Sequence, residues 1–505
     1  TFALTSDTLG SKSTAVGVDA LASQNFTTAT DSFNVAVGYK AGDATTTGVG
    51  NTLIGGLAGD ALTDADFNVA IGKNALSTDT LGSFSTAVGI NALETQNFTT
   101  ATTSHNTAIG ALAGAAVTTG QNNTLIGSSA GLSQTTAGSN TLIGNFCGDA
   151  LTAGQLNTVV GYAALSNDTL GSRTTAIGYA ALNATNFTTA TDSYNTSVGY
   201  AAGFSVTTGI NNTIMGGLAG DALTDADSNI AIGTGALSTD TLGSRSVAIG
   251  EGALNEQNFT TATNSNNVAV GYAAGNKVST GVQNTFVGAL AGDATDDGTN
   301  NVAVGFEALS ANCGSGNVAL GTRAGKVSTA DNNTFVGLSA GQSVTSGANN
   351  TLIGAICADS MQTNTEMTAV GYNLAATSQT GRAREIIIGS NGTGAGSNTV
   401  RFITSEGSAT LNIDGSDTSW AAASDSRLKK EVADSTVGLE FIKDLRPVTF
   451  KWNAKNAIAD SLPQYDADSS DPVYGQGKAH HGFIAQEVKT VIDAHSDVVN
   501  GHNIW

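Results

Sequence analysis

The stretch NTLIGGLAGDALTDADFNVAIGKNA, residues 51–75, decides the fold because it holds one complete motif and the start of the next. The motif runs from Asn51 to Gly55 and begins again at Asn68, so that Gly55 and Gly72 are 17 residues apart. A short motif that returns at a fixed spacing is typical of repeat proteins, in which each copy forms one coil stacked on its neighbours. The stretch therefore predicts a long stack of similar coils.

The motif continues through most of the chain. Its glycine occurs 22 times, at positions 17, 38, 55, 72, 89, 110, 127, 144, 161, 178, 199, 216, 233, 250, 271, 288, 305, 321, 337, 354, 371 and 389. Most steps are 17 residues long, and four are 21 because each holds an insert of the type NFTTAT. No proline occurs in the first 423 residues. Because proline cannot donate a backbone hydrogen bond to a β-ladder, its absence favours stacked β-strands.

Three positions of the motif suggest how a coil is packed. The residue before the glycine is Val or Ile in 20 of the 22 copies, so we expect its face of the strand to be the inner one. Three residues after the glycine, Ala appears in 18 copies and Cys in two, which predicts that Cys147 and Cys357 are packing residues. An Asn four residues before the glycine occurs in 16 copies and predicts a ladder of side-chain amides. The glycine itself predicts a positive φ or the close approach of a neighbouring backbone.

The succession NVAVGYKAG (34–42), NTLIGGLAG (51–59) and NVAIGKNAL (68–76) resembles the left-handed parallel β-roll heads of bacterial trimeric adhesins. The resemblance implies left-handed coils and three chains. A single coil of small residues cannot stabilise itself, which also favours a core shared among several chains. We therefore predict a homotrimer.

Composition excludes several classes of function. The net charge of −21 makes nucleic acid an unlikely partner, since nucleic acid is itself an anion. The three cysteines are far apart and odd in number, so the sequence suggests neither a disulfide framework nor a zinc pair. No apolar run is long enough to predict insertion into a membrane. The chain begins at Thr1 within a repeat, and we expect a missing N-terminal region that attaches to other proteins.

Two features of the repeat are candidate binding sites. The acidic turns, at Asp60, Asp64, Asp66 and again at Asp221, Asp225, Asp227, could supply carboxylates to calcium, but a solvated acidic edge is the favoured interpretation. We predict no metal and no cofactor. The insert residues Phe26, Phe98, Phe187 and Phe259 are expected to fold back over the coil edge. The alternative is a row of exposed contacts for a glycan or a host surface.

The composition changes at SWAAASDSRLKK, residues 419–430, which predicts a boundary between two folds. We assign residues 1–398 to the repetitive shaft, residues 399–423 to a short β neck, and residues 424–505 to a separate C-terminal domain. All three prolines lie in this last part.

The C-terminal blocks SDSRLKKEV, LEFIKDLRPVTFKW and HGFIAQEVKTVI resemble, in this order, the intramolecular chaperone of phage tailspikes, tail fibres and endosialidases. That domain trimerises the fibre and then cuts itself off. The resemblance implies Ser424 as nucleophile, Lys429 as its base, and cleavage between Ala423 and Ser424. Asp425 and Arg427 are assigned to positioning. Related domains continue into long helices, so we expect this one to be incomplete at its C-terminus.

Other interpretations remain open for these residues. On spacing alone, Ser424 is a helix cap and Lys429 a solvated lysine. His480 and His481 precede the last block and are expected to be structural. A serine becomes a nucleophile only when a base takes its proton, and lysine can act as that base when burial lowers its pKa. We expect self-cleavage in a single turnover and no turnover enzyme.

The sequence thus predicts a mainly β protein: a parallel β-roll or β-helix shaft of about 22 coils in a homotrimer, a β neck and an α+β chaperone domain. The predicted function is a bacteriophage tail fibre on the virion that attaches to a receptor or glycan of the host-cell surface. The alternatives are a cellular trimeric adhesin and, less favoured, a polysaccharide-degrading tailspike.

Overall fold

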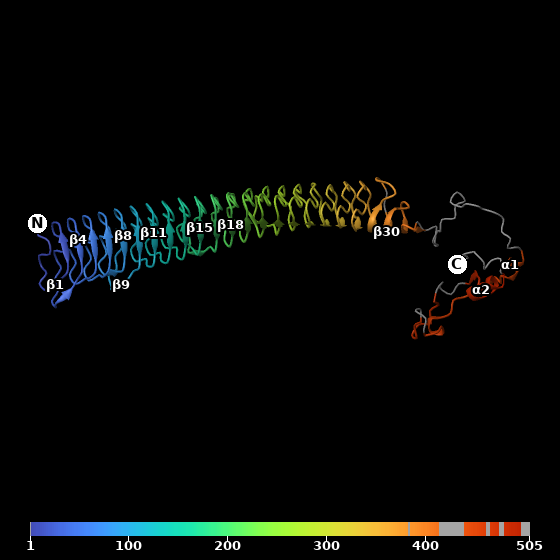
Figure 1. Ribbon diagram of the computed structural model, residues 1–505, viewed down its shortest axis with the longest axis horizontal. Helices are drawn as coiled ribbons and strands as arrows, with labels where there is room; N and C mark the ends of the chain where they lie inside the picture. Colours follow the sequence, from blue (N-terminus) through green and yellow to red (C-terminus); the bar gives the residue numbers. More distant parts are fainter. Residues whose placement is uncertain (1, 382–383, 414–438, 461–464, 474–478, 496–505) are drawn as a thin grey trace. The chain divides into compact units, whose positions relative to one another are not determined.

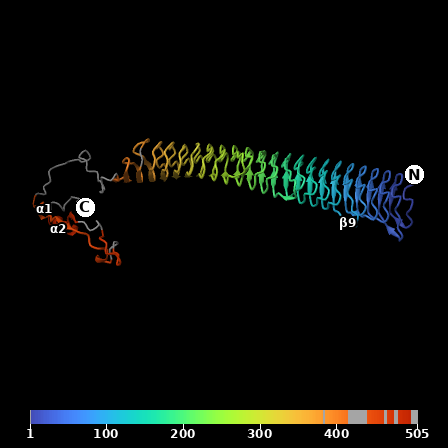
Figure 2. The same cartoon turned by 180° about the vertical axis from the view of Figure 1, so that it is seen from behind.

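The computed structural model describes residues 2–381, 384–413, 439–460, 465–473 and 479–495. Contacts divide the chain into two units, Thr1–Ala422 and Ala423–Trp505. The first unit is an elongated stack of coils, seen from the front in Figure 1 and from behind in Figure 2. It is a β-solenoid of about 23 turns, and the predicted repetitive, mainly β fold is confirmed.

Each coil contributes one strand to a single sheet that runs along the stack. The strands are β2 (Thr14–Val16), β4 (Val35–Val37), β5 (Thr52–Ile54), β6 (Val69–Ile71), β8 (Thr86–Val88), β10 (Thr107–Ile109), β11 (Thr124–Ile126), β12 (Thr141–Ile143), β13 (Thr158–Val160), β15 (Thr175–Ile177), β17 (Thr196–Val198), β18 (Thr213–Met215), β19 (Ile230–Ile232), β21 (Val247–Ile249), β23 (Val268–Val270), β24 (Thr285–Val287), β25 (Val302–Val304), β26 (Val318–Leu320), β27 (Thr334–Val336), β28 (Thr351–Ile353), β29 (Thr368–Ala375), β30 (Glu385–Thr393), β31 (Thr399–Thr404) and β32 (Gly407–Asn412). From β2 to β31, neighbouring strands of this sheet pair in parallel and in chain order, so that Thr107 lies opposite Thr86 on one side and Thr124 on the other. Each inner coil therefore has its backbone hydrogen bonds satisfied by the coils on both sides.

A short pair of parallel strands accompanies each of the four inserts. The pairs are β1 (Gly10–Ser11) with β3 (Thr30–Asp31), β7 (Gly82–Ser83) with β9 (Thr102–Thr103), β14 (Gly171–Ser172) with β16 (Thr191–Asp192), and β20 (Gly243–Ser244) with β22 (Thr263–Asn264). Each insert is thus part of the stack and continues its parallel pairing.

The inner face of the main sheet is formed by the residue two positions before each motif glycine. Ala36, Leu53 and Phe286 at this position are fully buried. By contrast, Ile54 and Ile109, directly before the glycine, are 37% and 40% exposed. The prediction that the Val or Ile position faces inward is therefore wrong. The reason is that successive side chains of a strand point to opposite faces. The Asn four residues before the glycine is buried, so the residue two positions before the glycine faces inward with it, and the residue directly before the glycine faces outward.

The predicted asparagine ladder is present, and most of its hydrogen bonds run to the backbone. The backbone N–H of Asn51 donates to Asn34 Oδ1 over 2.8 Å, and Asn51 Nδ2 donates to the carbonyl oxygen of Ala65 over 2.8 Å. Asn68 repeats the first bond with Asn51 Oδ1 at 2.9 Å. Because a buried amide must satisfy both its oxygen and its nitrogen, these bonds explain why Asn is favoured at this position.

The motif glycine meets both predicted conditions at once. Gly216 has φ of 134°, and a β-carbon placed on it would lie 2.7 Å from the carbonyl carbon and oxygen of Gly233 in the next coil. A side chain is therefore excluded by space as well as by backbone conformation. The adjacent Gly217 has no atom within 4 Å of such a β-carbon. Only the first of these two glycines is required by the fold.

The insert phenylalanines fold back against the stack, as predicted. Phe98 and Phe187 are each 5% exposed, so the alternative of an exposed row of phenylalanine contacts is wrong. A β-carbon on Gly82 would lie 2.8 Å from the ring of Phe98, and one on Gly171 would lie 2.9 Å from the ring of Phe187. The glycine of the TLGS segment therefore leaves room for the ring that closes each insert.

The stack ends in longer strands and a hairpin. β29 and β30 have eight and nine residues, and β31 pairs with β32 in the antiparallel sense. Glu385 takes the place of the ladder asparagine and accepts hydrogen bonds from Thr377 Oγ1 and the N–H of Gly396, both over 2.7 Å. The part of the predicted neck beyond residue 413 lies outside the described residues.

The described part of the second unit is small and mixed. It contains α1 (Leu439–Asp444), β33 (Val448–Phe450), the 3₁₀ turn η2 (Lys455–Ala457), β34 (His480–Gly482) and α2 (Ala485–Ala494). The predicted helix in the last sequence block corresponds to α2. Within the described ranges, no helix is both long enough and apolar enough to cross a membrane.

Candidate functional site

The residues predicted to cut the chain cannot be placed. Ala423, Ser424, Asp425, Arg427 and Lys429 all lie outside the described residues. Their roles stay predictions.

The described elements beside these residues are joined by polar contacts. Arg446, between α1 and β33, donates from Nε to Glu487 Oε2 of α2 over 2.9 Å, and its second nitrogen donates to Glu487 Oε1. The hydrogen bond from Arg446 lowers the pKa of Glu487. His495 Nε2 lies 2.9 Å from Asp444 Oδ2 and joins the ends of α2 and α1. Both pairs link α2 to the segment that holds α1, and because they are exposed they add little stability.

An apolar cavity of about 550 Å³ lies in this unit. It is lined by Phe450, Lys451, Trp452, Asn453, Ile458, Val473, Phe483, Ile484, Ala485 and Gln486. Phe483 is 51% exposed, and Leu439 and Ile442 of α1 are exposed further. Exposed apolar patches of this kind mark surfaces that associate with another chain.

The two histidines of β34 have different surroundings. His480 stacks on Phe450 with ring centroids 5.7 Å apart, and its centroid lies 6.4 Å from that of Trp452. His481 is exposed. Contacts with aromatic rings support the predicted structural role for His480.

In the shaft, each insert encloses a carboxylate that sequence reasoning missed, and it is buried in the last three inserts and half-buried in the first. In the second insert, Asp79 accepts hydrogen bonds from the N–H groups of Gly82 and Phe98, and from Gln96 Nε2 over 2.6 Å. Asn106 Nδ2 in turn donates to Gln96 Oε1 over 2.8 Å. The first and fourth inserts repeat this arrangement with Gln24 and Gln257. The recurring DTLG segment followed by a glutamine could have revealed it.

The third insert departs from this pattern. Thr185 replaces the glutamine and donates to the carbonyl oxygen of Val206 over 3.0 Å. Asp168 keeps its bonds to Gly171 and Phe187, but its Oδ2 is buried without a protein partner. Burial raises the pKa of Asp168.

The first insert shows what the glutamine does to such a carboxyl group. Burial opposes ionisation of Asp7 as well, but the hydrogen bond from Gln24 and backbone hydrogen bonds lower its pKa. The glutamine and the backbone donors together favour the charged form of this half-buried carboxyl group.

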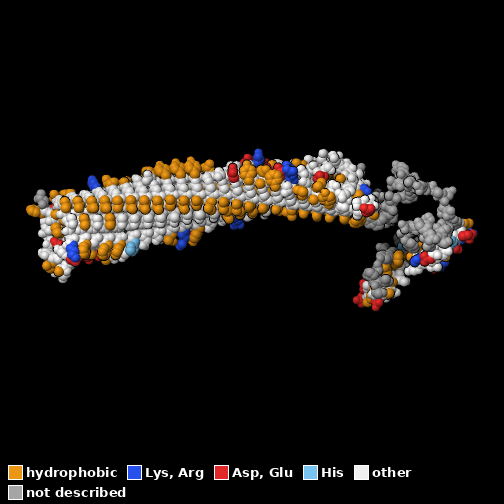
Figure 3. Space-filling view, viewed as in Figure 1, with side chains coloured by type: hydrophobic (Ala, Val, Ile, Leu, Met, Phe, Trp, Pro, Cys, Tyr) orange, Lys and Arg blue, Asp and Glu red, His pale blue; other side chains and the backbone are white. Residues whose placement is uncertain are grey.

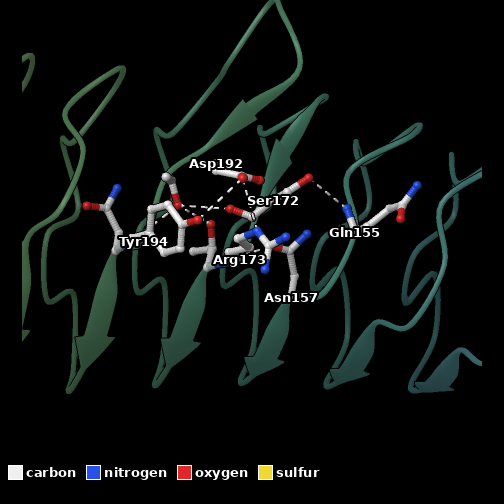
Figure 4. A network of polar contacts seen from close by, with 9 residues as sticks. Gln155, Asn157, Ser172, Arg173, Asp192 and Tyr194 are labelled. Atoms are coloured by element: carbon white, nitrogen blue, oxygen red, sulfur yellow. Dashed lines mark hydrogen bonds and ion pairs between the residues drawn. The ribbon is translucent and has the colours of Figure 1, made fainter.

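The surface of the third insert carries a charged and aromatic cluster. Arg173 Nε lies 3.0 Å from Asp192 Oδ2, and its guanidinium carbon lies 5.8 Å from the centre of the Tyr194 ring. Figure 4 shows this cluster beside Ser172, whose hydroxyl accepts from the N–H of Gln155 over 3.0 Å. The first insert has a similar cluster, in which Lys12 pairs with Asp31 and lies over the ring of Phe33. Both clusters are half exposed and hold the insert against the preceding coil.

Exposed apolar side chains form a row along the shaft. They occupy the position directly before each motif glycine, and none of them is buried. Figure 3 shows hydrophobic side chains in a continuous row along the stack. A row of this length on one face is unusual for a chain that stays alone in water.

Aromatic rings form a second, shorter column. The Tyr162 and Tyr179 ring centroids are 5.5 Å apart, and those of Tyr179 and Tyr200 are 5.3 Å apart. Phe146 meets Tyr162 edge-on at 6.0 Å. Sequence reasoning missed this column, although three tyrosines that directly follow the motif glycine in successive coils signal it.

The acidic turns hold neighbouring coils together. Asp64 Oδ1 accepts from Thr47 Oγ1 over 2.5 Å, and Asp66 Oδ1 accepts from the N–H of Val49 over 2.8 Å. Asp225 and Asp227 repeat these bonds. Within the described ranges, no group of three or more His, Cys, Asp or Glu side chains is arranged to hold a metal ion. These four carboxylates therefore bind separate donors of a neighbouring coil.

The three cysteines are buried and unbonded to one another. Burial raises the pKa of Cys147 to about 12 and that of Cys357 to about 11. A thiol that does not ionise is a poor nucleophile, which agrees with the predicted packing role.

Comparison with known proteins gives one match. Residues 424–497 match the family model described as chaperone of endosialidase. No curated protein matches the chain. No solved structure matches it either. A C-terminal match of this kind behind a β-solenoid shaft fits a tail fibre of the endosialidase type.

Proposed function

We propose that the chain is one subunit of a homotrimeric bacteriophage tail fibre that attaches to the host-cell surface. Its C-terminal part is an intramolecular chaperone that drives trimerisation and then releases itself. The observation that carries this proposal is the match of residues 424–497 to the endosialidase chaperone family, directly after a β-solenoid shaft.

The exposed apolar row supports the trimer. Ile54, Ile109 and Ile353 are each between 37% and 40% exposed, and every coil places one exposed or half-buried apolar side chain in the row. Apolar surface removed from water stabilises an assembly by about 25 cal/mol per Å². Interfaces of permanent homo-oligomers are large and apolar at their centre. Three copies packed along this row bury it over the whole shaft.

The exposed apolar surface of the second unit supports a chaperone that works as an oligomer. Leu439 and Ile442 of α1 and Phe483 beside α2 are more than half exposed in the single chain. Association of three copies covers such side chains. The chaperone then brings three shafts together in the same register, so that coil stacking can proceed along them.

Self-release follows from the chemistry of Ser424 and Lys429. Lys429 accepts the hydroxyl proton of Ser424 while the oxygen attacks the carbonyl carbon of Ala423. The peptide C–N bond breaks, the proton passes to the freed Ser424 amine, and Ala423 is joined to the side-chain oxygen as an ester. Water then hydrolyses the ester to give the Ala423 carboxylate and the Ser424 hydroxyl. Burial of Lys429 on assembly lowers its pKa and couples cleavage to trimerisation.

Sedimentation of the purified full chain tests the assembly. The expected species has three chains, each of 50.3 kDa before cleavage. Electron micrographs of the virus that carries the protein test the attachment, and antibodies against the shaft are expected to label its tail fibres. A monomer that stays folded in solution would contradict the proposal.

A further inference from the structure

The residues that directly follow the motif glycine form a ladder on the surface of the shaft. The residue type at this position differs from coil to coil, and examples are Lys73, Thr234 and Glu251. The exposed apolar row, by contrast, is Val, Ile, Leu or Met in every coil. A position that accepts either sign of charge is one that faces water in the assembled fibre, because an unpaired charge is costly to bury.

Three successive coils break this variable pattern with tyrosines. Tyr162, Tyr179 and Tyr200 are 49%, 51% and 60% exposed. Their rings are nearly parallel, with interplanar angles of 10° and 11°. No hydrogen bond of their hydroxyl groups is found among the described residues. The column therefore offers apolar ring surface and free polar tips together.

The stacking also holds the rings in place before any ligand arrives. A tyrosine has few rotatable bonds, and packing against its neighbours restricts them further. A ligand that binds such a column loses little free energy in ordering side chains.

The next position along the coil is small in the same three coils. Ala163, Ala180 and Ala201 follow the three tyrosines. Phe146 occupies this position in the coil before them and Leu218 in the coil after them, and both are exposed. Ala180 and Ala201 are only 5% and 8% exposed, so the tyrosine rings themselves form the surface of the strip. The strip is three coils long and is bounded at each end by a large apolar side chain.

The size and charge of the strip decide what kind of ligand fits it. A tyrosine that is half exposed offers about 100 Å², so the column offers about 300 Å². A stable protein interface needs about 800 Å² from each partner. The strip also contains no charged side chain. Its area is too small for a protein partner, and it offers no charged side chain to pair with an ionic ligand.

We propose that the strip of Tyr162, Tyr179 and Tyr200 binds an uncharged oligosaccharide that runs along the shaft. The rings pack against the apolar faces of the sugars, and the hydroxyls bond to sugar hydroxyls. The site rests on the proposed attachment function and gives it a ligand class. Three copies in a trimer multiply a weak single contact into strong attachment.

The test is affinity electrophoresis of the full chain in native gels that contain dextran, a mannan or a galactan. A gel with polysialic acid serves as the anionic comparison. The test variant is Tyr162→Ser, Tyr179→Ser, Tyr200→Ser. The matched control is Tyr39→Ser, Tyr272→Ser, Tyr372→Ser, because these isolated tyrosines hold the same coil position and are 55%, 58% and 52% exposed.

Retardation of the wild type and the control by at least one neutral polysaccharide is expected, with at least tenfold weaker binding by the strip variant. Sedimentation must give the same mass for all three proteins, so that loss of binding is not loss of assembly. The proposal is overturned if no neutral polysaccharide retards the wild type, if both variants bind equally, or if polysialic acid alone retards it. Failure of the fibre proposal shows separately, as a monomer in sedimentation.

Discussion

Thr185 occupies the position that glutamine holds in the other three inserts, and Asp168 Oδ2 beside it is buried without a protein partner. The equivalent carboxylates of Asp79 and Asp240 each accept a hydrogen bond from a glutamine nitrogen. The third insert therefore contains a polar group that the fold buries without satisfying it. Such a group lowers the stability of the folded state.

Thr185→Gln is expected to stabilise the shaft by about 1–3 kcal/mol, because it supplies the missing donor to Asp168 and an acceptor for Asn195. Denaturant unfolding measures the change. The reverse variant Gln96→Thr in the second insert is the control, and it should destabilise by a similar amount. Equal stability of Thr185→Gln and wild type would show that Asp168 is satisfied in another way.

The gain from Thr185→Gln should depend on pH. Burial raises the pKa of Asp168 above its usual value of 3.8. A carboxyl group with a raised pKa in the folded state favours folding while it is protonated, and this contribution is lost as pH rises through the folded pKa. The stability difference between variant and wild type should therefore grow from acidic to neutral pH. A difference that shrinks as pH rises would contradict this explanation.

Gly216→Ala should lower the free energy of unfolding by at least about 2 kcal/mol, since the new methyl group meets Gly233 and the backbone has positive φ. Gly217→Ala changes the adjacent residue, where the methyl group meets nothing, and should stay within about 0.5 kcal/mol. Thermal unfolding of the two variants is the measurement. Similar losses for both would mean that coil stacking does not require glycine at the motif position.

The double variant Ile177→Glu, Val198→Glu should prevent trimer formation, because it places two charges in the exposed apolar row. The control Thr234→Glu adds a charge at the position where the next coil already carries Glu251. Sedimentation should show a trimer for the control and smaller species for the double variant. A trimer of the double variant would place the interface elsewhere.

Phe98→Ala should destabilise the second insert by about 3–5 kcal/mol, because it empties a buried site against Gly82. Phe84→Ala, which removes a ring that is 46% exposed, should cost about 1 kcal/mol. Hydrogen exchange of the insert backbone reports the loss locally. If the two variants lose equal protection, the insert phenylalanine does not close the coil.

The sequence predicted the repeat well because stacking in register makes every coil show the same constraint. The motif glycines, the asparagine ladder and the insert phenylalanines each depend on contacts between equivalent residues of successive coils, and periodicity exposes such contacts. The inner face was mistaken for a different reason. The residues of the inner face vary because each coil divides its core volume between two positions, the strand position and the position six residues later. Where the strand position is Leu53, the later residue is the small Gly59, and where it is Ala70, the later residue is the large Leu76. In the proposed trimer, the nearly uniform Val and Ile row is the surface that the other two chains cover.

The candidate sites were predicted less completely. The tyrosine column and the carboxylate of Asp168 depend on small departures from the repeat, which a consensus motif hides. Ser424 and Lys429 were identified through resemblance, and they lie outside the described residues. Their spacing in sequence does not fix the distance between the amine and the hydroxyl, since that distance depends on the fold.

The intact masses of the wild-type protein and of Ser424→Ala after assembly test the central claim most directly. The account predicts that the wild type separates into a shaft that ends at Ala423 and a fragment that begins at Ser424, while Ser424→Ala keeps one mass. Lys429→Ala should also stay intact. Identical, uncut masses for the wild type and Ser424→Ala, in a protein that sediments as a trimer, would contradict self-release.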